Sequence, residues 1–414
     1  MNKIIFLIAV CLFKQAALAQ TDTLTLAKAI ETALVNNGNI KIAQREVVKN
    51  EYSLKETKTN LFPTIYGTAH YLFAPINLYS EAVTNGGEYG LQVSTSYTIY
   101  DGDKNNDQIN KATLNINKAE LSTQKTKSDL KYDIRSIYIE INRLKSECNI
   151  RQKSDSIFTE YISLLKQLKL SGIASEGDIL KAEVEFNNNN ILFSTLKQNI
   201  IKLKYALNNI IGVKIDKQFE VTEPNEIDSL NNESNPIDNI TDIKLTQKEI
   251  ELSNYDIQIA KKEKLPTVNL NGDFGFLGIY PKEYLHNAGF SVAISLSIPL
   301  FDWGAIDSRI NQSEISRAQN EIKLDVQKRE LNTAILSFQN DINLAKENIA
   351  KYSSNISLAI NNYNNAKLRF KGGVGSNLEV LDAHQLIVES EINFNNAIAQ
   401  LRSAKFNLLK IYGN

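Results

Sequence analysis

The residues able to do chemistry are few and widely separated in this chain of 414 residues. His70, His286 and His384 stand far apart, and we expect them on a strand, in a loop and on a helix surface. Three histidines, two cysteines and the single methionine argue against a dedicated soft-metal site. No nucleotide-binding loop or nucleophile motif occurs, and the formal net charge of −1 gives no electrostatic reason to expect nucleic-acid binding. The sequence therefore predicts no catalytic centre, no metal and no cofactor.

The carboxylates say more about function than the histidines and cysteines do. Glu379 and Asp382 stand three residues apart, which places them on one face of a predicted helix that starts after a glycine-rich segment. Asp178 holds the equivalent position of an earlier segment, where Lys181 follows instead of a second acid. Acidic side chains near a helix N-terminus interact favourably with the helix dipole, so a structural role is one interpretation of these residues.

The two acidic segments belong to a long internal repeat. Gly172 to Ala182 recurs as Gly373 to Ala383, a displacement of 201 residues (373 − 172 = 201). The same displacement relates three further identical pairs: Phe193 and Phe394, Leu207 and Leu408, Gly212 and Gly413. Solenoid units are much shorter, about 20–50 residues. We therefore predict two copies of one half-molecule, each with helices, two strands and two very long helices.

Most of the chain has helical periodicity. Apolar residues from Leu331 to Phe370 recur at alternating steps of four and three, the heptad pattern of coiled coils. A helix from Trp303 to Phe370 would be roughly 100 Å long, and glycines then end it. Cys148 falls on the apolar side of the matching helix in the first half, where a packed, unreactive thiol is the better interpretation. Shorter helical pieces are predicted over 26–60 and 240–264.

Four segments alternate apolar and polar residues with period two, at about 64–74, 89–100, 267–277 and 289–300. Pro63, Pro266 and Pro299 mark the boundaries between helix and strand. Such alternation over about ten residues is typical of transmembrane β-strands, although a soluble sheet with one wet face shows it too. Membrane barrels need about eight strands, so several chains would have to combine theirs, and three chains would supply twelve.

The repeat, the periodicity and the first residues together predict the domain organisation. Residues 1–19 are expected to be a secretory signal that ends at Ala17-Leu18-Ala19. Residues 20–212 form the first repeat, with its helix turn near 171–177, and residues 213–239 form a polar connector. Residues 240–414 form the second repeat, with its helix turn near 371–377.

These features resemble the TolC-like outer-membrane efflux and secretion channels over essentially the whole mature chain. The resemblance depends on the duplicated Gly-x-x-x-x-x-[Asp/Glu]-[Val/Ile]-Leu-x-Ala turns at 172–182 and 373–383, and on the strand-to-helix exit Ile298 to Gly304. It implies a mixed α and β fold made mainly of long helices. It further implies a homotrimer in which a 12-stranded outer-membrane β-barrel, four strands per chain, continues as an α-helical coiled-coil barrel in the periplasm, with the connector at its equatorial region.

The resemblance also implies a function and site residues. The chain would be the outer-membrane channel of a tripartite efflux pump or type I secretion system, a passive duct for small molecules or proteins. It would work in outer-membrane lipid with a periplasmic adaptor and an inner-membrane transporter. Glu379, Asp382 and Asp178 would line the periplasmic entrance, where carboxylates attract cations. The adaptor-docking turns would contain Gly172, Ala174, Ser175, Gly373, Gly375 and Ser376.

One family feature is missing, and two other functions stay open. The tyrosine and arginine that constrain the closed entrance in the family correspond here to Phe370 and Gly375. Closure must therefore rest on packing or on other polar contacts.

An exported coiled-coil structural protein or adhesin without channel activity is the alternative from another class, followed by an exported enzyme. The sequence does not identify the cargo.

Overall fold

The computed structural model describes residues 23–72, 88–223, 236–278 and 288–413. The predicted signal segment, His286, residues 73–74 of the first predicted strand and residues 224–235 of the connector lie outside these ranges. The described chain forms two compact units. One comprises residues 23–41, 124–223, 236–240 and 329–413, and we call it the helical unit. The other comprises the described residues of 42–123 and 241–328, and we call it the strand unit.

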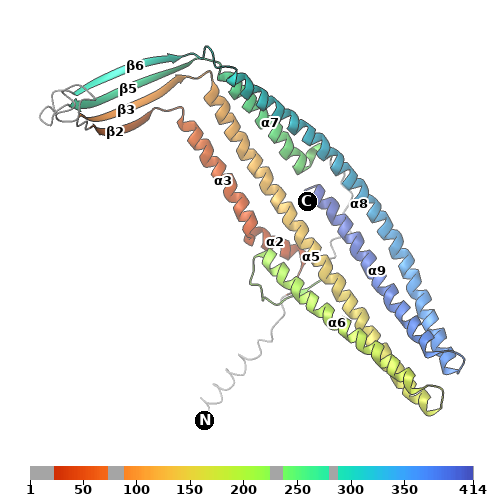
Figure 1. The fold of residues 1–414 in the computed structure, drawn as a ribbon. Helices are drawn as coiled ribbons and strands as arrows, with labels where there is room; N and C mark the ends of the chain where they lie inside the picture. The colour runs from red at the N-terminus through yellow and green to blue at the C-terminus, as the bar shows by residue number, and fades with distance from the viewer. Residues whose placement is uncertain (1–22, 73–87, 224–235, 279–287, 414) are drawn as a thin grey trace, which may run out of the picture. The chain divides into compact units, whose positions relative to one another are not determined.

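The helices and strands follow the predicted order (Figure 1). The described elements are β1 (Thr23–Leu24), α2 (Leu26–Asn36), α3 (Gly38–Thr59), β2 (Thr64–Leu72), β3 (Glu88–Tyr100), α5 (Lys104–Leu170), α6 (Glu176–Ile211), β4 (Glu220–Val221), η2 (Ile237–Asn239), α7 (Thr241–Lys262), β5 (Thr267–Gly278), β6 (Ala288–Ser297), α8 (Ala305–Lys371) and α9 (Asn377–Ile411). Within these described elements, no helix has the length and apolar character that a membrane span requires.

The strand unit contains a four-stranded antiparallel sheet in the order β2-β3-β5-β6. Val93, Phe274 and Phe290 are register partners on three neighbouring strands, and the next row contains Ser94, Asp273 and Ser291. Because side chains alternate between the two faces of a strand, one face of the sheet is apolar and the other polar. Every residue of β2 and β6 is exposed in the single chain.

The register of the sheet is fixed by hydrogen bonds on its polar face. The Asp273 carboxylate accepts hydrogen bonds from Gln92 Nε2 at 2.7 Å, from Ser94 Oγ at 2.7 Å and from Ser291 Oγ at 3.2 Å. A slip of one residue would exchange the two faces and separate the carboxylate from its donors.

Two boundaries differ from the prediction. β6 ends at Ser297 and not at residue 300, because Pro299 has no N–H to donate to a strand neighbour. The helical stretch predicted over 26–60 is two helices, interrupted at Asn37. The Asn37 side chain accepts a hydrogen bond from the Asn39 N–H at 2.8 Å and donates one to the Ile210 carbonyl at 2.8 Å. It therefore caps α3 and ties it to the end of α6.

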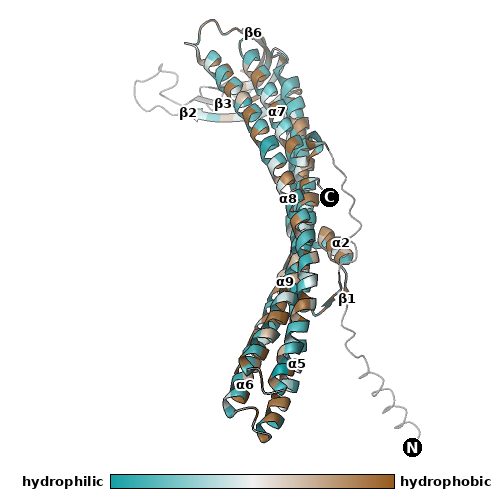
Figure 2. Ribbon diagram, turned by 90° about the vertical axis from the view of Figure 1, so that its right-hand side faces the viewer, coloured by the Kyte–Doolittle hydropathy of each residue, from teal (hydrophilic) through white to brown (hydrophobic). Residues whose placement is uncertain are grey.

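The helical unit contains α6, α9 and the parts of α5 and α8 that end at the turns. α5 and α8 have 67 residues each, while α6 and α9 have 36 and 35. Apolar and polar residues are interspersed along the helices (Figure 2), as expected of rods that pack along a seam. The largest buried cluster joins α2, α5, α6, β4 and α9 through residues that include Ala33, Ile134, Tyr138, Leu207, Val221 and Phe406. Cys148 is also buried, and burial raises the pKa of its thiol.

The described start of the connector packs on this unit. β1 and β4 pair in parallel, with Leu24 opposite Val221. The buried Tyr138 hydroxyl lies 3.0 Å from the Leu24 carbonyl and 2.9 Å from Thr222 Oγ1. Lys204 Nζ donates to the Phe219 carbonyl at 2.7 Å. Side chains of α5 and α6 thus provide hydrogen-bond partners for the short strand pair. The two helices hold this segment in place.

Gly212, which ends α6, provides a test of how closely α2 packs against the end of α6. Its φ is +76°, and a Cβ there would lie 3.0 Å from the Asn36 carbonyl oxygen. Gly172 has the same φ with nothing within 4 Å of a Cβ. We expect Gly172→Ala to cost about 1–2 kcal/mol for the left-handed backbone alone, and Gly212→Ala to cost more because α2 must move. Thermal unfolding of both variants, followed by circular dichroism, checks this. Equal losses of stability in the two variants would contradict the close approach of α2 and α6.

Candidate functional site

The candidate site is the pair of turns that join α5 to α6 and α8 to α9. In the first turn Gly172 has φ +76°, and the Ile173 N–H donates to the Leu168 carbonyl at 3.0 Å. In the second, Gly373 has φ +71°, and the Val374 N–H donates to the Arg369 carbonyl at 3.0 Å. A glycine in the left-handed region closes each helix by returning an N–H to its last carbonyls. The repeated glycines therefore produce two sharp reversals of the chain.

The helix that leaves each turn begins with a serine cap. Ser175 Oγ accepts a hydrogen bond from the Asp178 N–H at 3.2 Å, and Asp178 Oδ2 accepts one from the Ser175 N–H at 2.8 Å. This is a complete capping box. Ser376 Oγ accepts from the Glu379 N–H at 3.2 Å, but the Glu379 carboxylate makes no return bond among the described contacts. The two acids at equivalent positions thus have different roles.

Hydrogen bonding also determines the charge state of Asp178. Its partial burial raises the pKa of the carboxyl, but the bonds from Ser175, with a contribution from Asn377, outweigh that effect and hold the pKa below its usual value. The carboxylate is therefore ionised and held by its cap, and its place at the periplasmic entrance stays a prediction.

Asn377 connects the two turns. It is buried, and its Oδ1 accepts a hydrogen bond from the Tyr161 hydroxyl at 2.8 Å, while its Nδ2 donates to the Asp178 main-chain carbonyl at 3.1 Å. Burial raises the pKa of Tyr161 far above its ordinary value, so the phenol stays a donor. Around this link lies an apolar cluster from four helices, which includes Leu165, Ala182, Phe370, Val380 and Ile387. Asn377 could not be identified from the sequence, because only the fold brings it to both partners.

The positions where the family has its constraining tyrosine and arginine are filled by packing. Phe370 is buried, with its ring centroid 6.4 Å from that of Tyr161. A Cβ on Gly375 would lie 3.0 Å from the Phe370 nitrogen, so a longer side chain would not fit without a shift. Tyr161, whose ring lies beside Phe370, makes a polar link to Asn377 within the chain.

Glu379 and Asp382 are both exposed at the start of α9. Arg369 lies across the turn from Glu379, with Nη1 3.5 Å from Oε2. Asp382 lines a groove of about 510 Å³ together with Leu180, Val184, Leu378 and Leu381. A groove lined largely by apolar residues of α6 and α9 suits a packing partner better than a small polar ligand.

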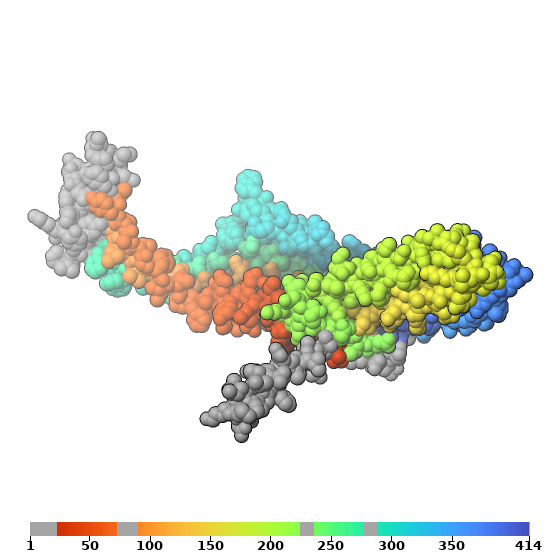
Figure 3. All heavy atoms as spheres, turned by 90° about the horizontal axis from the view of Figure 1, so that it is seen from below, coloured from red at the N-terminus to blue at the C-terminus, as the bar shows by residue number. Residues whose placement is uncertain are grey.

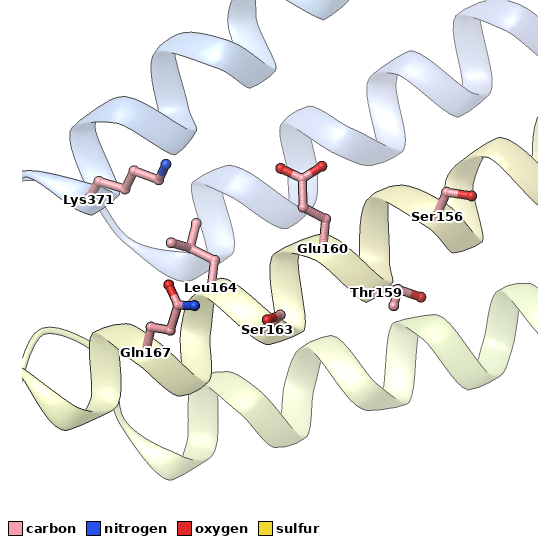
Figure 4. Close-up of a pocket in the computed structure, with 7 residues that line it drawn as sticks. All are labelled: Ser156, Thr159, Glu160, Ser163, Leu164, Gln167 and Lys371. Carbon is pink, nitrogen blue, oxygen red and sulfur yellow. The ribbon is translucent and has the colours of Figure 1, made fainter.

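A second groove, of about 620 Å³, lies along α5 near the end of α8 (Figure 4). Glu160 and Lys371 extend into the same space there, among the hydroxyls of Ser156, Thr159 and Ser163. The hydrogen bond from Lys367 Nζ to Glu160 at 2.9 Å lowers the pKa of that carboxyl. This ion pair joins α5 to α8 on the solvent side, where it contributes little to stability.

His384 is not on a helix surface, and that prediction is wrong. Its side chain is buried, with the ring centroid 4.5 Å from that of Phe158 and 5.8 Å from that of Tyr363. Burial lowers the pKa of His384 to about 4, so the imidazole is neutral at physiological pH. Its closest polar neighbour is Ser154 Oγ at 3.4 Å. His384 is therefore part of the buried core next to the turns.

The remaining predicted residues divide between the two units. Ala174 is buried against the cluster at the first turn, whereas Gly172, Ser175, Gly373 and Ser376 are exposed. Pro63 lies between α3 and β2, Pro266 between α7 and β5, and Pro299 between β6 and α8. No group of histidine, cysteine and carboxylate side chains that could hold a metal occurs among the residues that the structure describes.

Comparison with known proteins identifies the architecture. The profile of the family described as outer membrane efflux protein matches residues 29–213 and 235–414. The chain belongs to this family. It is 21% identical to the solvent efflux pump outer membrane protein SrpC of Pseudomonas putida, over 94% of this chain and 85% of SrpC. It is 19% identical to the outer membrane efflux protein BepC of Brucella suis, over 96% of this chain and 86% of BepC.

A solved structure shows the same fold. The outer membrane protein VceC of Vibrio cholerae superposes with a TM-score of 0.81 at 17% identity, over 94% of this chain and 96% of VceC. The chain is therefore an outer membrane efflux protein, mainly helical with some sheet, located in the outer membrane and extending into the periplasm. This family is one of transport channels and not of enzymes, and the adhesin alternative is not favoured.

We predict that Asn377→Ala destabilises the helical unit more than Tyr161→Phe does. The first change leaves the buried Tyr161 hydroxyl without its acceptor, at about 1–3 kcal/mol, and also removes the donor to the part-buried Asp178 carbonyl. The second change leaves only the Asn377 Oδ1 without its donor. Urea unfolding followed by circular dichroism measures the difference, with Asn361→Ala on the exposed side of α8 as the control. A loss no greater than that of the control would show that the link is not formed.

Proposed function

We propose that three copies of this efflux protein form one passive duct through the outer membrane and the periplasm. The observation that carries the proposal is the four-stranded sheet, whose outer strands β2 and β6 have 9 and 10 residues and no strand neighbour on their outer side among the described residues. In lipid, each unpaired N–H or C=O costs several kcal/mol. Pairing β6 of one copy with β2 of the next removes both edges.

The strand count and the long helices together favour three copies. Two copies would supply eight strands and three would supply twelve, and barrels of either size exist. The long helices favour the larger ring, because a channel must stay open inside a wall of helices that each measure about 10–12 Å across. With three copies, the polar face that holds Asp273, Ser94 and Ser291 lines the lumen, and the apolar face meets lipid.

The surface of α8 supports assembly of the helices as well. Four leucines on this helix are more than half exposed in the single chain: Leu336, Leu344, Leu358 and Leu368. Figure 3 shows α6 lying along the surface, where Leu180, Val184 and Ile191 are also exposed. Apolar side chains in rows along helices at the outer surface are typical of contacts with further helices. In the proposed trimer these faces would form the wall of the tunnel.

The energy for transport would come from outside this chain. We propose that the exposed turns around Gly172 and Gly373 dock a periplasmic adaptor, which connects the duct to an inner-membrane transporter. The names of SrpC and BepC describe efflux, and SrpC is named for solvents. These names support export of small molecules over secretion of proteins. In this proposal the channel catalyses no reaction.

The assembly is tested with protein purified from outer membranes. We expect a threefold particle with a hollow centre in electron micrographs, dissociation to monomers on heating, and stepwise conductance in planar bilayers. A soluble monomer without conductance would refute the duct and revive the structural-protein alternative.

Ion selectivity separately tests whether Glu379 and Asp382 line the proposed entrance. If Glu379 and Asp382 of three copies surround the passage, the double variant Glu379→Gln, Asp382→Asn removes six carboxylates, and the ratio of cation to anion permeability should fall severalfold. Reversal potentials in a salt gradient measure this ratio. Glu347→Gln, which removes an exposed carboxylate from the middle of α8, is the matched control and should leave the ratio unchanged. If selectivity is unchanged in the double variant, these two acids serve only to stabilise the start of α9.

A further inference from the structure

Asp273 is a fixed negative charge midway along the four-stranded sheet. Among the described residues of β2, β3, β5 and β6, the carboxylates are Glu88 and Asp273, and lysine and arginine are absent. Glu88 is the first residue of β3, whereas Asp273 is the seventh of the 12 residues of β5. Ionisable residues inside a membrane are rare, and those that occur face water or mark a path for ions. The position of Asp273 therefore needs a physical explanation.

Three donors hold the Asp273 carboxylate against the polar face of the sheet. Its Oδ1 accepts hydrogen bonds from Gln92 Nε2 and Ser94 Oγ, each at 2.7 Å, and its Oδ2 accepts one from Ser291 Oγ at 3.2 Å. An ionised carboxylate only accepts hydrogen bonds, so it suits three donors. Ser94 and Ser291 lie on the two neighbouring strands, β3 and β6, in register with Asp273. The charge is thus held at one level of the sheet.

The neighbouring rows show that this face does not need a charge to join its strands. Asn271 and Asn269 lie on the same face of β5, two and four residues before Asp273. The Asn269 amide oxygen accepts a hydrogen bond from Thr98 Oγ1 at 2.9 Å, and Asn271 Nδ2 donates to Ser295 Oγ at 3.4 Å. Neutral amides therefore connect β5 to both of its neighbours in these rows. The charge of Asp273 adds something that strand pairing alone does not require.

In the proposed trimer, symmetry would place the three Asp273 carboxylates at one level of the lumen. A strand spacing of about 4.8 Å and a tilt of about 40° give a ring of twelve strands a backbone diameter of about 24 Å. Each carboxylate extends inward from this wall, so it lies within about 12 Å of the axis, close to the Debye length of about 10 Å in about 0.1 M salt. In dilute salt the negative potential of the ring would therefore extend over most of the passage.

We propose that Asp273 sets the ion preference of the strand layer of the duct. The inference rests on the proposed trimer and on its polar lumen. Asp273 belongs to the strand unit, whereas Glu379 and Asp382 belong to the helical unit, so this ring would act separately from the proposed entrance. Rings of carboxylates attract cations and repel anions. Neutral and cationic solutes would pass this layer more readily than anions of the same size. The competing role is purely structural, in which Asp273 accepts hydrogen bonds and its charge does not affect transport.

Moving the charge by one row separates its effect from that of the hydrogen bonds. The full-length channel with Glu379→Gln and Asp382→Asn is the parent, so that these two acids do not contribute. In this parent, Asp273→Asn removes the charge and Asn271→Asp adds a second one. The double exchange Asp273→Asn, Asn271→Asp moves the charge about 7 Å along β5. Asn271→Ser is the control, because it changes the amide without adding a charge.

Reversal potentials in planar bilayers, across a potassium chloride gradient near about 0.1 M, measure the ratio of cation to anion permeability. We expect this ratio to fall severalfold with Asp273→Asn and to rise severalfold with Asn271→Asp. The double exchange and the control should stay close to the parent. In about 1 M salt the differences should disappear, because the Debye length is then about 3 Å.

Three results would overturn the inference. Equal ratios in the parent and in the two single charge variants would leave Asp273 with its structural role alone. A double exchange that loses selectivity as Asp273→Asn does would show that the hydrogen bonds of that row matter and the charge does not. Differences that persist in concentrated salt would indicate a changed pore shape.

The native channel separates failure of this inference from failure of the proposed duct. If the native protein gives no conductance, the proposed function fails. If it conducts and the ratios do not follow the charge, only the assignment of Asp273 fails. Should Asp273→Asn not assemble in the outer membrane, the comparison of Asn271→Asp with its parent decides, because that variant keeps the hydrogen-bond partners of Asp273.

Discussion

The backbone hydrogen bonds of a four-stranded sheet with two open edges are the constraint on which the structure depends. Among the described residues, β3 and β5 have strand neighbours on both sides, and β2 and β6 have one neighbour each. In water the open groups would bond to solvent, but in lipid they need another strand. Under the proposed function, the full exposure of β2 and β6 in the single chain would end on assembly. It connects a local feature of the sheet to the proposed trimer.

The helical unit meets a different requirement, since it must end two pairs of long helices at one place. The glycine turns reverse the chain, and the Tyr161–Asn377–Asp178 link holds the two reversals together through buried groups. An exposed ion pair such as Arg369 with Glu379 contributes little by comparison. The mechanical connection between the turns is thus internal to each chain. Opening of the proposed entrance would move the two helix pairs of one chain together, or would break a buried contact at a cost of about 1–3 kcal/mol for each unpaired group.

Much of this could be predicted from local pattern. Period-two alternation predicted β3, β5 and β6 within about three residues of their ends in the described chain, and the heptad steps predicted α8. What could not be predicted depends on long-range contact. Asn377 resembles any asparagine near a helix start, and its importance arises from Tyr161, 216 residues away. His384 was misjudged because its position next to an exposed acid suggested a surface, whereas α9 buries it between Phe158 and Tyr363. The interruption at Asn37 depends on the end of α6.

The two turns and the two strand exits differ between the two predicted repeats. Asp178 closes a capping box, whereas Glu379 at the equivalent position leaves its carboxylate free to face Arg369. Gly102 lies against Leu265, whereas Trp303 at the equivalent position is exposed, and each exit has one residue other than glycine with positive φ, Asp103 in the first and Trp303 in the second. In both cases the first half uses the position for folding, and the second half leaves it available to something outside the chain. In the proposed trimer the two kinds of half would alternate around the axis, so each role would recur without every helix having to serve both.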